Sequence, residues 1–179
     1  MSERGHVVIL RNFLRRLEDK RISCILDAGS GRTSLGILKE CFPTAELDAV
    51  VYPGDQRKID SICSLGLGED ACRILEKDIC SESFRKEYDL VTAHLLLGEA
   101  ARFGNTFEDL LRRLLEIRAK YLIIIDYLED PRVDKALIDQ FCEEGEITVI
   151  AEGCVKNEEP KVWHDFAGEH NFGYLLCRK

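Results

Sequence analysis

Long apolar runs are missing from this chain, and with them the sequence signature of a membrane-spanning helix. No stretch approaches the roughly 18 uninterrupted apolar residues that cross a bilayer. The start of the chain, MSERGHVVILRNFLRR, also has no apolar signal core followed by a small-residue cleavage site. We therefore predict a cytoplasmic protein without a membrane partner.

Metal-ligand spacings are missing as well. The chain has 8 cysteines, but no two of them stand at the CxxC spacing, and its 4 histidines (6, 94, 164 and 170) supply no paired ligand set. Asp126 follows an apolar segment, yet one carboxylate is insufficient for a magnesium site. The sequence predicts no metal site, and in a cytoplasmic protein we expect the cysteines to be thiols.

Basic charge is scarce outside the N-terminal region. The chain has 25 Lys and Arg against 33 Asp and Glu, a net charge of -8. Residues 1–40 hold eight basic and five acidic side chains (+3), so residues 41–179 carry -11. This balance gives no whole-chain footprint for a nucleic-acid backbone, although the basic N-terminal face leaves one narrow place where RNA could dock.

Apolar residues make up 45% of the 179 residues, which is enough for one substantial core. We predict a single domain over residues 1–179, with an N-terminal helix in residues 1–20 and the core in 21–179. The helix is expected over 6–20, because apolar residues recur there at helical spacing and basic residues occupy the remaining surface.

Strand-like and helix-like segments alternate along the core. Strands are expected at 22–27, 46–52, 72–76, 88–94 and 121–126, and helices include 59–65, 107–118 and one from Asp130 to Gly145. The last two strands, 147–155 and 173–177, are separated only by a polar stretch, so we expect them to be antiparallel. The pattern predicts a three-layer, doubly wound α/β domain of five βα units closed by a β-hairpin.

A glycine turn, AGSGRTSLG, follows the first expected strand. Ligands of open α/β sheets bind beyond the carboxyl ends of the strands, so Gly29 and Gly31 are expected to adopt positive φ and let a ligand approach the backbone. The Gly-Lys-Ser or Gly-Lys-Thr ending of a P-loop is absent. A dinucleotide fingerprint also fails, because Ser34 replaces its third glycine and Asp48 lies inside the second strand instead of at its end.

The segment Asp27-Ala28-Gly29-Ser30-Gly31 resembles motif I of the class I methyltransferases that use S-adenosylmethionine. The resemblance runs from about residue 21 to 177: Asp78-Ile79 resembles the segment that borders the cofactor adenine, and YDLVTAH at 88–94 resembles the motif of the fourth strand. It implies a Rossmann-like, seven-stranded, mostly parallel sheet with a C-terminal antiparallel strand. It also implies S-adenosylmethionine as the cofactor.

The same resemblance gives roles to the residues of the glycine turn. Asp27 would hold the methionine amino end of the cofactor, and Gly29 and Gly31 would let the backbone, with Ala28 and Ser30, skirt it. The alternative for Asp27 is a cap that accepts hydrogen bonds from the N–H groups of the turn.

Further roles follow at the ends of the third and fourth strands. Asp78 would accept a hydrogen bond from the adenine amino group and Ile79 would offer its amide, while His94 would lie near the sulfonium as the catalytic candidate. The structural alternatives are that Asp78 caps a helix beginning at Ser81 and that His94 is a satisfied residue at a strand end.

The chain departs from the family at two places. Thr33 stands where a third glycine is usual, and Val51-Tyr52-Pro53 stands where an acid usually binds the ribose. Either Asp55 reaches back to the ribose, or Tyr52 stacks on the adenine without a ribose clamp, or the cofactor binds weakly. The sequence therefore predicts a methyltransferase, with a catalytically inactive binding or scaffold protein as the alternative and a nicotinamide oxidoreductase as a third reading.

The sequence does not identify the methyl acceptor. The Asn-Pro-Pro-Tyr and Asp-Pro-Pro-Tyr signatures are absent after the fourth strand, and so is the Pro-Cys context of the cytosine-C5 type. A small molecule, a protein and RNA are all candidate acceptors. The short chain has few residues for a lid over the substrate, so a second copy or a partner chain is a candidate to supply one. The aromatic and imidazole groups near the C-terminus either line a substrate mouth or cover a sheet edge: Trp163, His164, Phe166, His170, Phe172 and Tyr174.

Overall fold

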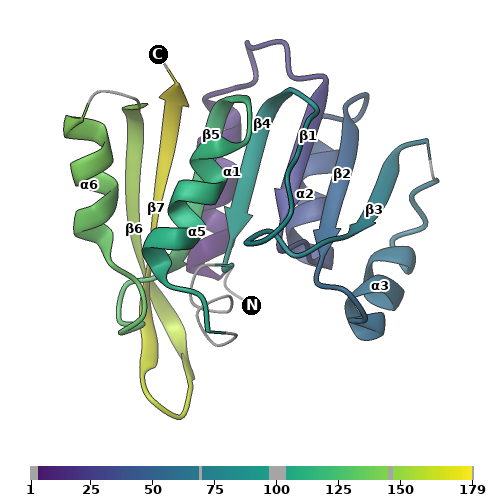
Figure 1. Cartoon of the computed structure of the whole chain (residues 1–179). Helices are drawn as coiled ribbons and strands as arrows, with labels where there is room; N and C mark the ends of the chain where they lie inside the picture. Colours follow the sequence, from purple (N-terminus) through teal and green to yellow (C-terminus); the bar gives the residue numbers. More distant parts are fainter. Residues whose placement is uncertain (1–3, 69, 97–103, 145–146, 179) are drawn as a thin grey trace.

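One sheet organises the computed structural model, which describes residues 4–68, 70–96, 104–144 and 147–178 (Figure 1). Its seven strands have the order β3-β2-β1-β4-β5-β7-β6, with β1 to β5 parallel and β7 antiparallel to both β5 and β6. This confirms the predicted mostly parallel sheet with a C-terminal antiparallel strand. The strands are β1 (Cys24–Ala28), β2 (Glu46–Val51), β3 (Cys72–Glu76), β4 (Tyr88–His94), β5 (Ala119–Tyr127), β6 (Ile147–Val162) and β7 (Ala167–Arg178).

Helices cover both faces of the sheet and complete three layers (Figure 1). One face packs α1, α2 and α3 around a core that includes Leu10, Leu35 and Ile62, and the other packs α5 and α6 around a core that includes Leu111 and Ile138. Among the helices of the described residues, none is long and apolar enough to cross a membrane. The helices are α1 (Gly5–Arg15), α2 (Arg32–Cys41), α3 (Gln56–Cys63), α5 (Phe107–Glu116) and α6 (Lys135–Glu143).

The N-terminal helix is shorter than its apolar spacing predicts. It was expected over 6–20, but α1 ends at Arg15 and residues 16–20 form turns. The N–H groups of Arg16 and Leu17 bond three residues back, to Phe13 and Leu14, which tightens the chain out of the α-helix. Leu17 is nevertheless buried, so the apolar spacing that predicted helix there reflects a core contact made by a turn.

The connection between β3 and β4 differs from the expected βα unit. Residues 77–87 contain no helix, and Asp78 instead closes a turn in which its carboxylate accepts from the Cys80 N–H and the Ser81 hydroxyl, both at 3.0 Å. The alternative that Asp78 caps a helix beginning at Ser81 is therefore wrong, although its carboxylate does cap the backbone of a turn.

The C-terminal hairpin is longer than the two expected strands. Its polar part, predicted as a connection, pairs as strand, with Lys161 opposite Gly168 and Val162 opposite Ala167. Pro160 and the charged residues beside it are tolerated because β6 is the last strand of the sheet and bonds along one side. The hairpin consequently projects past the carboxyl ends of the parallel strands (Figure 1).

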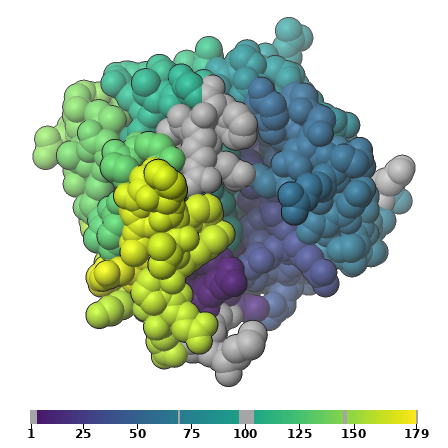
Figure 2. All heavy atoms as spheres, turned by 90° about the horizontal axis from the view of Figure 1, so that it is seen from below, coloured from purple at the N-terminus to yellow at the C-terminus, as the bar shows by residue number. Residues whose placement is uncertain are grey.

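The helix α1 fixes this projecting hairpin to the rest of the molecule. It contacts β5, β6 and β7, and the N–H of Gly5 donates to the Asn157 side chain of β6 at 2.9 Å. Seen from the carboxyl edge of the sheet, the N-terminal residues lie against the C-terminal hairpin (Figure 2). The start of α1 and the projecting part of the C-terminal hairpin thus meet at the edge where ligands of α/β sheets bind.

Candidate functional site

Two adjoining cavities open at the carboxyl edge of the parallel strands. The first has a volume of about 290 Å³ and the second about 390 Å³, and Gly29 and Lys58 line both. The first cavity is lined by Gly29, Val50, Tyr52, Pro53, Gly54, Asp55, Lys58, Lys77, Asp78, Ile79, Cys80, Leu96 and Asn105. The second is lined by Arg4, His6, Gly29, Gly31, Arg32, Thr33, Ser34, Lys58, His94, Leu95, Asp126, Tyr127, Asp130, Lys161, Trp163 and Phe166.

The glycine turn separates the two cavities and uses its two glycines differently. Gly29 has φ +68°, and a Cβ there would lie 2.5 Å from Leu96 Cδ1, so both conformation and space require glycine. Gly31 has φ -142°, an extended conformation open to any residue, so the expectation of positive φ is wrong for it. A Cβ at Gly31 would meet no atom within 4 Å. The missing side chain therefore leaves open space in the second cavity.

Asp27 lies beneath the turn and lines neither cavity. Its carboxylate accepts hydrogen bonds from the Ser34 hydroxyl at 2.6 Å and the Thr92 hydroxyl at 2.5 Å, which ties β1 to α2 and β4. The side chain is 1% exposed, and this burial raises its pKa to about 6. Ala28 and Ser30 are also buried and line neither cavity.

The first cavity brings together five of the predicted cofactor residues, the first of them Gly29. Tyr52 is half exposed at the end of β2, and Asp55 caps α3 by accepting from the Lys58 N–H at 3.1 Å. Asp78 and the buried Ile79 approach from the end of β3. The arrangement offers an apolar slot with carboxylates at its rim.

His94 lies in the second cavity and pairs with a residue that the sequence did not single out. Its Nε2 is 2.9 Å from Nδ1 of His6, the second residue of α1, and the two rings are 4.8 Å apart. Burial lowers the pKa of His6 to about 4, with Arg4 and Lys161 adding to the effect, and burial with the neighbouring His6 lowers that of His94 to about 3. A signal for His6 was available, because it shares the buried face of α1 with Ile9, Leu10 and Phe13 at helical spacing.

We expect both of these imidazoles to remain uncharged at pH 5.5, where an unperturbed histidine is largely protonated. Since both folded-state pKa values lie below 6.5, the pair contributes stability that is fully present above pH 6.5 and is lost as the pH falls toward 4. The free energy of unfolding does not isolate this effect, because Asp27 changes it in the opposite direction between about pH 6 and 4. An NMR titration of the imidazole rings measures the histidine pair directly. Rings that protonate near pH 6.5 would contradict the buried pair.

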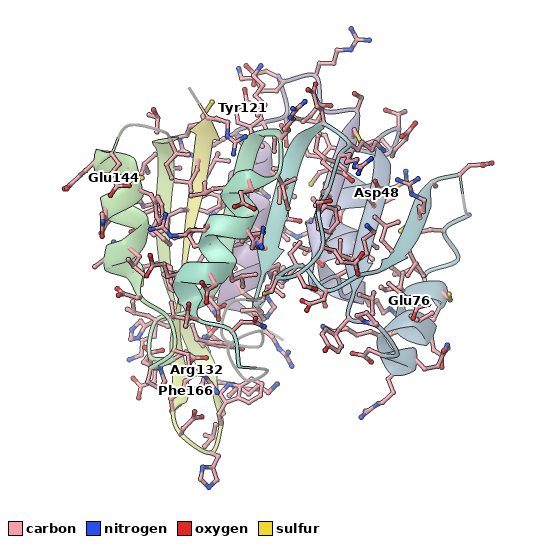
Figure 3. The ribbon with its side chains drawn as sticks, in the orientation of Figure 1. Asp48, Glu76, Tyr121, Arg132, Glu144 and Phe166 are labelled. Atoms are coloured by element: carbon pink, nitrogen blue, oxygen red, sulfur yellow. The ribbon has the colours of Figure 1, made fainter. Side chains whose placement is uncertain are left out.

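The aromatic residues of the hairpin divide between the second cavity and the core. Trp163 and Phe166 stack at the hairpin tip, with ring planes 21° apart, and line the second cavity together with Tyr127. Arg132 lies over Phe166 at 5.7 Å, as the two labelled side chains show (Figure 3). Phe172 and Tyr174 are buried in the core instead. Neither of them covers a sheet edge, because they belong to β7 and the last strand of the sheet is β6.

Two acids, Asp126 and Asp130, also line the second cavity. Asp126 accepts from the Tyr127 N–H at 2.8 Å, and Asp130 forms two hydrogen bonds of 2.7 and 3.0 Å with the Arg132 guanidinium. Within the described ranges, no group of three His, Cys, Asp or Glu side chains is arranged to hold a metal ion.

The fold is shared with solved methyltransferase structures. The N-methyltransferase NodS from Bradyrhizobium japonicum, solved with S-adenosyl-L-homocysteine, aligns with a TM-score of 0.70 at 13% identity over 99% of this chain and 89% of that chain. A candidate RNA methyltransferase from Pyrococcus horikoshii aligns at 0.68, with 18% identity over 96% and 84%. The magnesium protoporphyrin IX methyltransferase from Synechocystis, solved with S-adenosylmethionine, aligns at 0.67, with 13% identity over 98% and 80%.

No family model and no curated protein sequence matches the chain. The strand order 3-2-1-4-5-7-6 and the near-complete alignments nevertheless agree with one another. The chain has the fold of the class I S-adenosylmethionine-dependent methyltransferases.

Proposed function

We propose that this protein is an S-adenosylmethionine-dependent methyltransferase. The observation that supports this most directly is that Gly29, at the end of β1, lines two cavities at once. The adenosine part of the cofactor would occupy the first cavity and its methionine part would pass the glycine turn. The methyl acceptor would then occupy the second cavity, on the other side of the same turn.

The residues of the first cavity suit the nucleoside part of the cofactor. Ile79, Val50 and Leu96 offer apolar contacts to a planar base, and Asp78 offers carboxylate oxygens at the rim. No acid ends β2, where Val51 is buried, so Tyr52 and Asp55 are the residues that would meet the ribose. Asp55 already caps α3, which leaves its second oxygen for such a contact.

The glycine turn suits the methionine part, because Gly31 leaves open space directly beside Gly29. The first N–H groups of α2 follow at Arg32 and Thr33, where a helix N-terminus favours a carboxylate. When bound, the cofactor supplies an electrophilic methyl group on a sulfonium. The residues of the chain then act by holding the acceptor in line and excluding water, since proximity and orientation provide much of such a rate enhancement.

Calorimetric titration with S-adenosylmethionine and S-adenosylhomocysteine tests this proposal. We expect both to bind, and we expect Gly31→Val to weaken binding by about tenfold or more, because its side chain fills the open space beside the turn. The extended backbone at Gly31 accepts valine, so the variant should fold.

Gly36→Ala, on the same helix and also facing open space, is the matched control and should bind as the parent chain does. Absence of heat at high micromolar ligand with the parent chain would refute the proposal. Binding without methyl transfer to any acceptor would support the alternative of an inactive binding protein, which the departures at Thr33 and Val51 favour.

A further inference from the structure

We propose that the second cavity binds a small aromatic anion as the methyl acceptor, with its anionic group held by His6, Arg4 and Lys161 and its ring against Trp163 and Phe166. This inference rests on the proposed function, because it names the class of molecule that the methyl group would reach. The shared chemistry is a carboxylate or phosphate attached to a planar ring.

The first observation is an orphaned polar atom in the cavity wall. His6 is 4% exposed, its Nδ1 is used by His94, and its Nε2 is buried without a hydrogen-bond partner among the described residues. A buried polar atom without a partner carries an energetic cost, because it has lost its hydrogen bonds to water. A bound group that hydrogen-bonds to Nε2 would recover this cost. The unused hydrogen-bonding capacity of His6 therefore points to a ligand.

The second observation is the charge around that atom. Arg4 and Lys161 are close enough to lower the pKa of His6, and both side chains line the cavity. Arg32 and Lys58 line it too, which makes four cations against Asp126 and Asp130. Asp130 is itself paired with Arg132. A cavity with surplus positive charge in a chain of net charge -8 attracts an anion specifically to this place.

The neutral state of His6 and His94 determines which of their tautomers can donate to the ligand. Both imidazoles are neutral at pH 7, since their pKa values are about 4 and about 3. If His94 Nε2 donates to His6 Nδ1, then His6 Nε2 carries the N–H and donates to the ligand. An anion stabilises this arrangement, because it accepts from Nε2 while neutralising Arg4 and Lys161. His94 is then a positioning residue that orients His6.

The third observation is the aromatic wall. Trp163 and Phe166 stack with centroids 6.0 Å apart, and Lys161 lies over the Trp163 ring at 3.8 Å. Tyr127 approaches both rings, at 6.3 Å from Trp163 and 5.8 Å from Phe166. A planar ligand gains both apolar burial and ring contacts on such a wall. The cation over Trp163 places a positive charge beside the stacking surface.

A small acceptor fits these observations better than an RNA strand. The cations gather in one hollow of about 390 Å³, whereas a polynucleotide needs basic groups along an extended track. Outside residues 1–40 the chain carries -11, and two acidic residues, Glu158 and Glu159, closely precede Lys161 in β6.

Fluorescence of Trp163 tests the proposal, because it is the single tryptophan of the chain. The protein, saturated with S-adenosylhomocysteine, is titrated with 4-nitrobenzoate, with 4-nitrophenyl phosphate and with 4-nitrobenzamide, an uncharged analogue of the benzoate. We expect one or both anions to quench the fluorescence with an affinity about tenfold or more above that of the amide. The comparison of the two anions tells a carboxylate site from a phosphate site.

Variants locate the anionic group. Arg4→Gln and Lys161→Gln are each expected to reduce the preference for anion over amide several-fold, and so is His6→Gln, provided its melting temperature matches the parent chain. Lys156→Gln is the matched control, because it removes one cation from the same hairpin without touching the cavity. It should leave the preference unchanged.

Three results would overturn the inference. The amide binding as tightly as the anions would remove the charge selection, and an oligouridylate quenching more strongly than either anion would indicate a nucleic-acid acceptor. Loss of anion binding when S-adenosylhomocysteine is present would assign the cations to the cofactor carboxylate. Failure of the calorimetric titration with S-adenosylmethionine, with anion selection intact in the protein without S-adenosylhomocysteine, would instead refute the methyltransferase function.

Discussion

Gly173→Ala is expected to lower the free energy of unfolding by about 2 kcal/mol, within the usual cost of overpacking a core. Gly173 lies on β7 under α1, where an added Cβ would be 2.8 Å from Ile9 Cγ2, 3.0 Å from Phe13 Cε2 and 3.0 Å from the Ile124 carbonyl oxygen. The carbonyl belongs to the middle of the sheet and Ile9 is β-branched, so neither moves easily. Urea denaturation followed by circular dichroism measures the effect.

The partner strand provides a matched control. Gly153 of β6 stands opposite Gly173, and a Cβ there would lie 3.5 Å from Ile9 and 3.6 Å from Phe13, which is ordinary contact. Gly153→Ala should therefore change stability by less than about 0.5 kcal/mol. Equal losses in the two variants would show that α1 does not pack on β7 as closely as described. Because α1 also contains His6, the Gly173 variant should disturb the second cavity as well.

Asp27→Asn is expected to raise the free energy of unfolding above pH 6 by up to about 3 kcal/mol, since one pKa unit corresponds to about 1.4 kcal/mol. The folded-state pKa of Asp27 is raised from 3.8 to about 6, so the folded state binds this proton more tightly than the unfolded state does. Stability therefore falls as the pH rises from about 4 to 6, and the cost of the buried charge stays constant above that range. Asparagine removes the charge and still hydrogen-bonds the hydroxyls of Ser34 and Thr92.

Denaturation curves at pH 4 and pH 8 measure this effect, which should be absent at the lower value. Asp89→Asn is the control of opposite sign, because the Asp89 carboxylate accepts from the Ser23 N–H and hydroxyl and the Cys24 N–H, which hold its pKa below the ordinary value. That variant should lose stability at pH 8. The resemblance to motif I, which gives Asp27 the methionine amino end of the cofactor, implies that Asp27→Asn also weakens S-adenosylmethionine binding. A stabilised variant with full affinity would remove Asp27 from the cofactor site.

The parallel strands could be predicted from the sequence because their environment is uniform. Strands such as β4 (YDLVTAH) are buried on both faces, and a short continuous apolar run records that directly. The glycine turn was equally visible, since Gly29 has no alternative at φ +68°. In both cases the structural cause acts within a few residues.

The second cavity depends on causes that act across the chain. His6 reaches His94 only because α1 docks on β7, and Gly173, 167 residues away from His6, permits that approach. The hairpin tip was missed for a related reason: Lys156, Lys161 and Val162 pair because β7 provides a template, not because of the β-propensity of this polar segment. Spacing along the sequence contains neither the docking nor the pairing.

The outer edge of β6 bears on whether other extended chains can add to the sheet. An end strand of sixteen residues offers backbone groups to any other extended chain, which is a common start of aggregation. Here the register breaks twice, between Val149 and Ala151 and between Lys156 and Lys161, and Pro160 brings no N–H to the second break. The same irregular, charged segment that obscured the hairpin in the sequence thus keeps the sheet from growing by addition of a foreign strand.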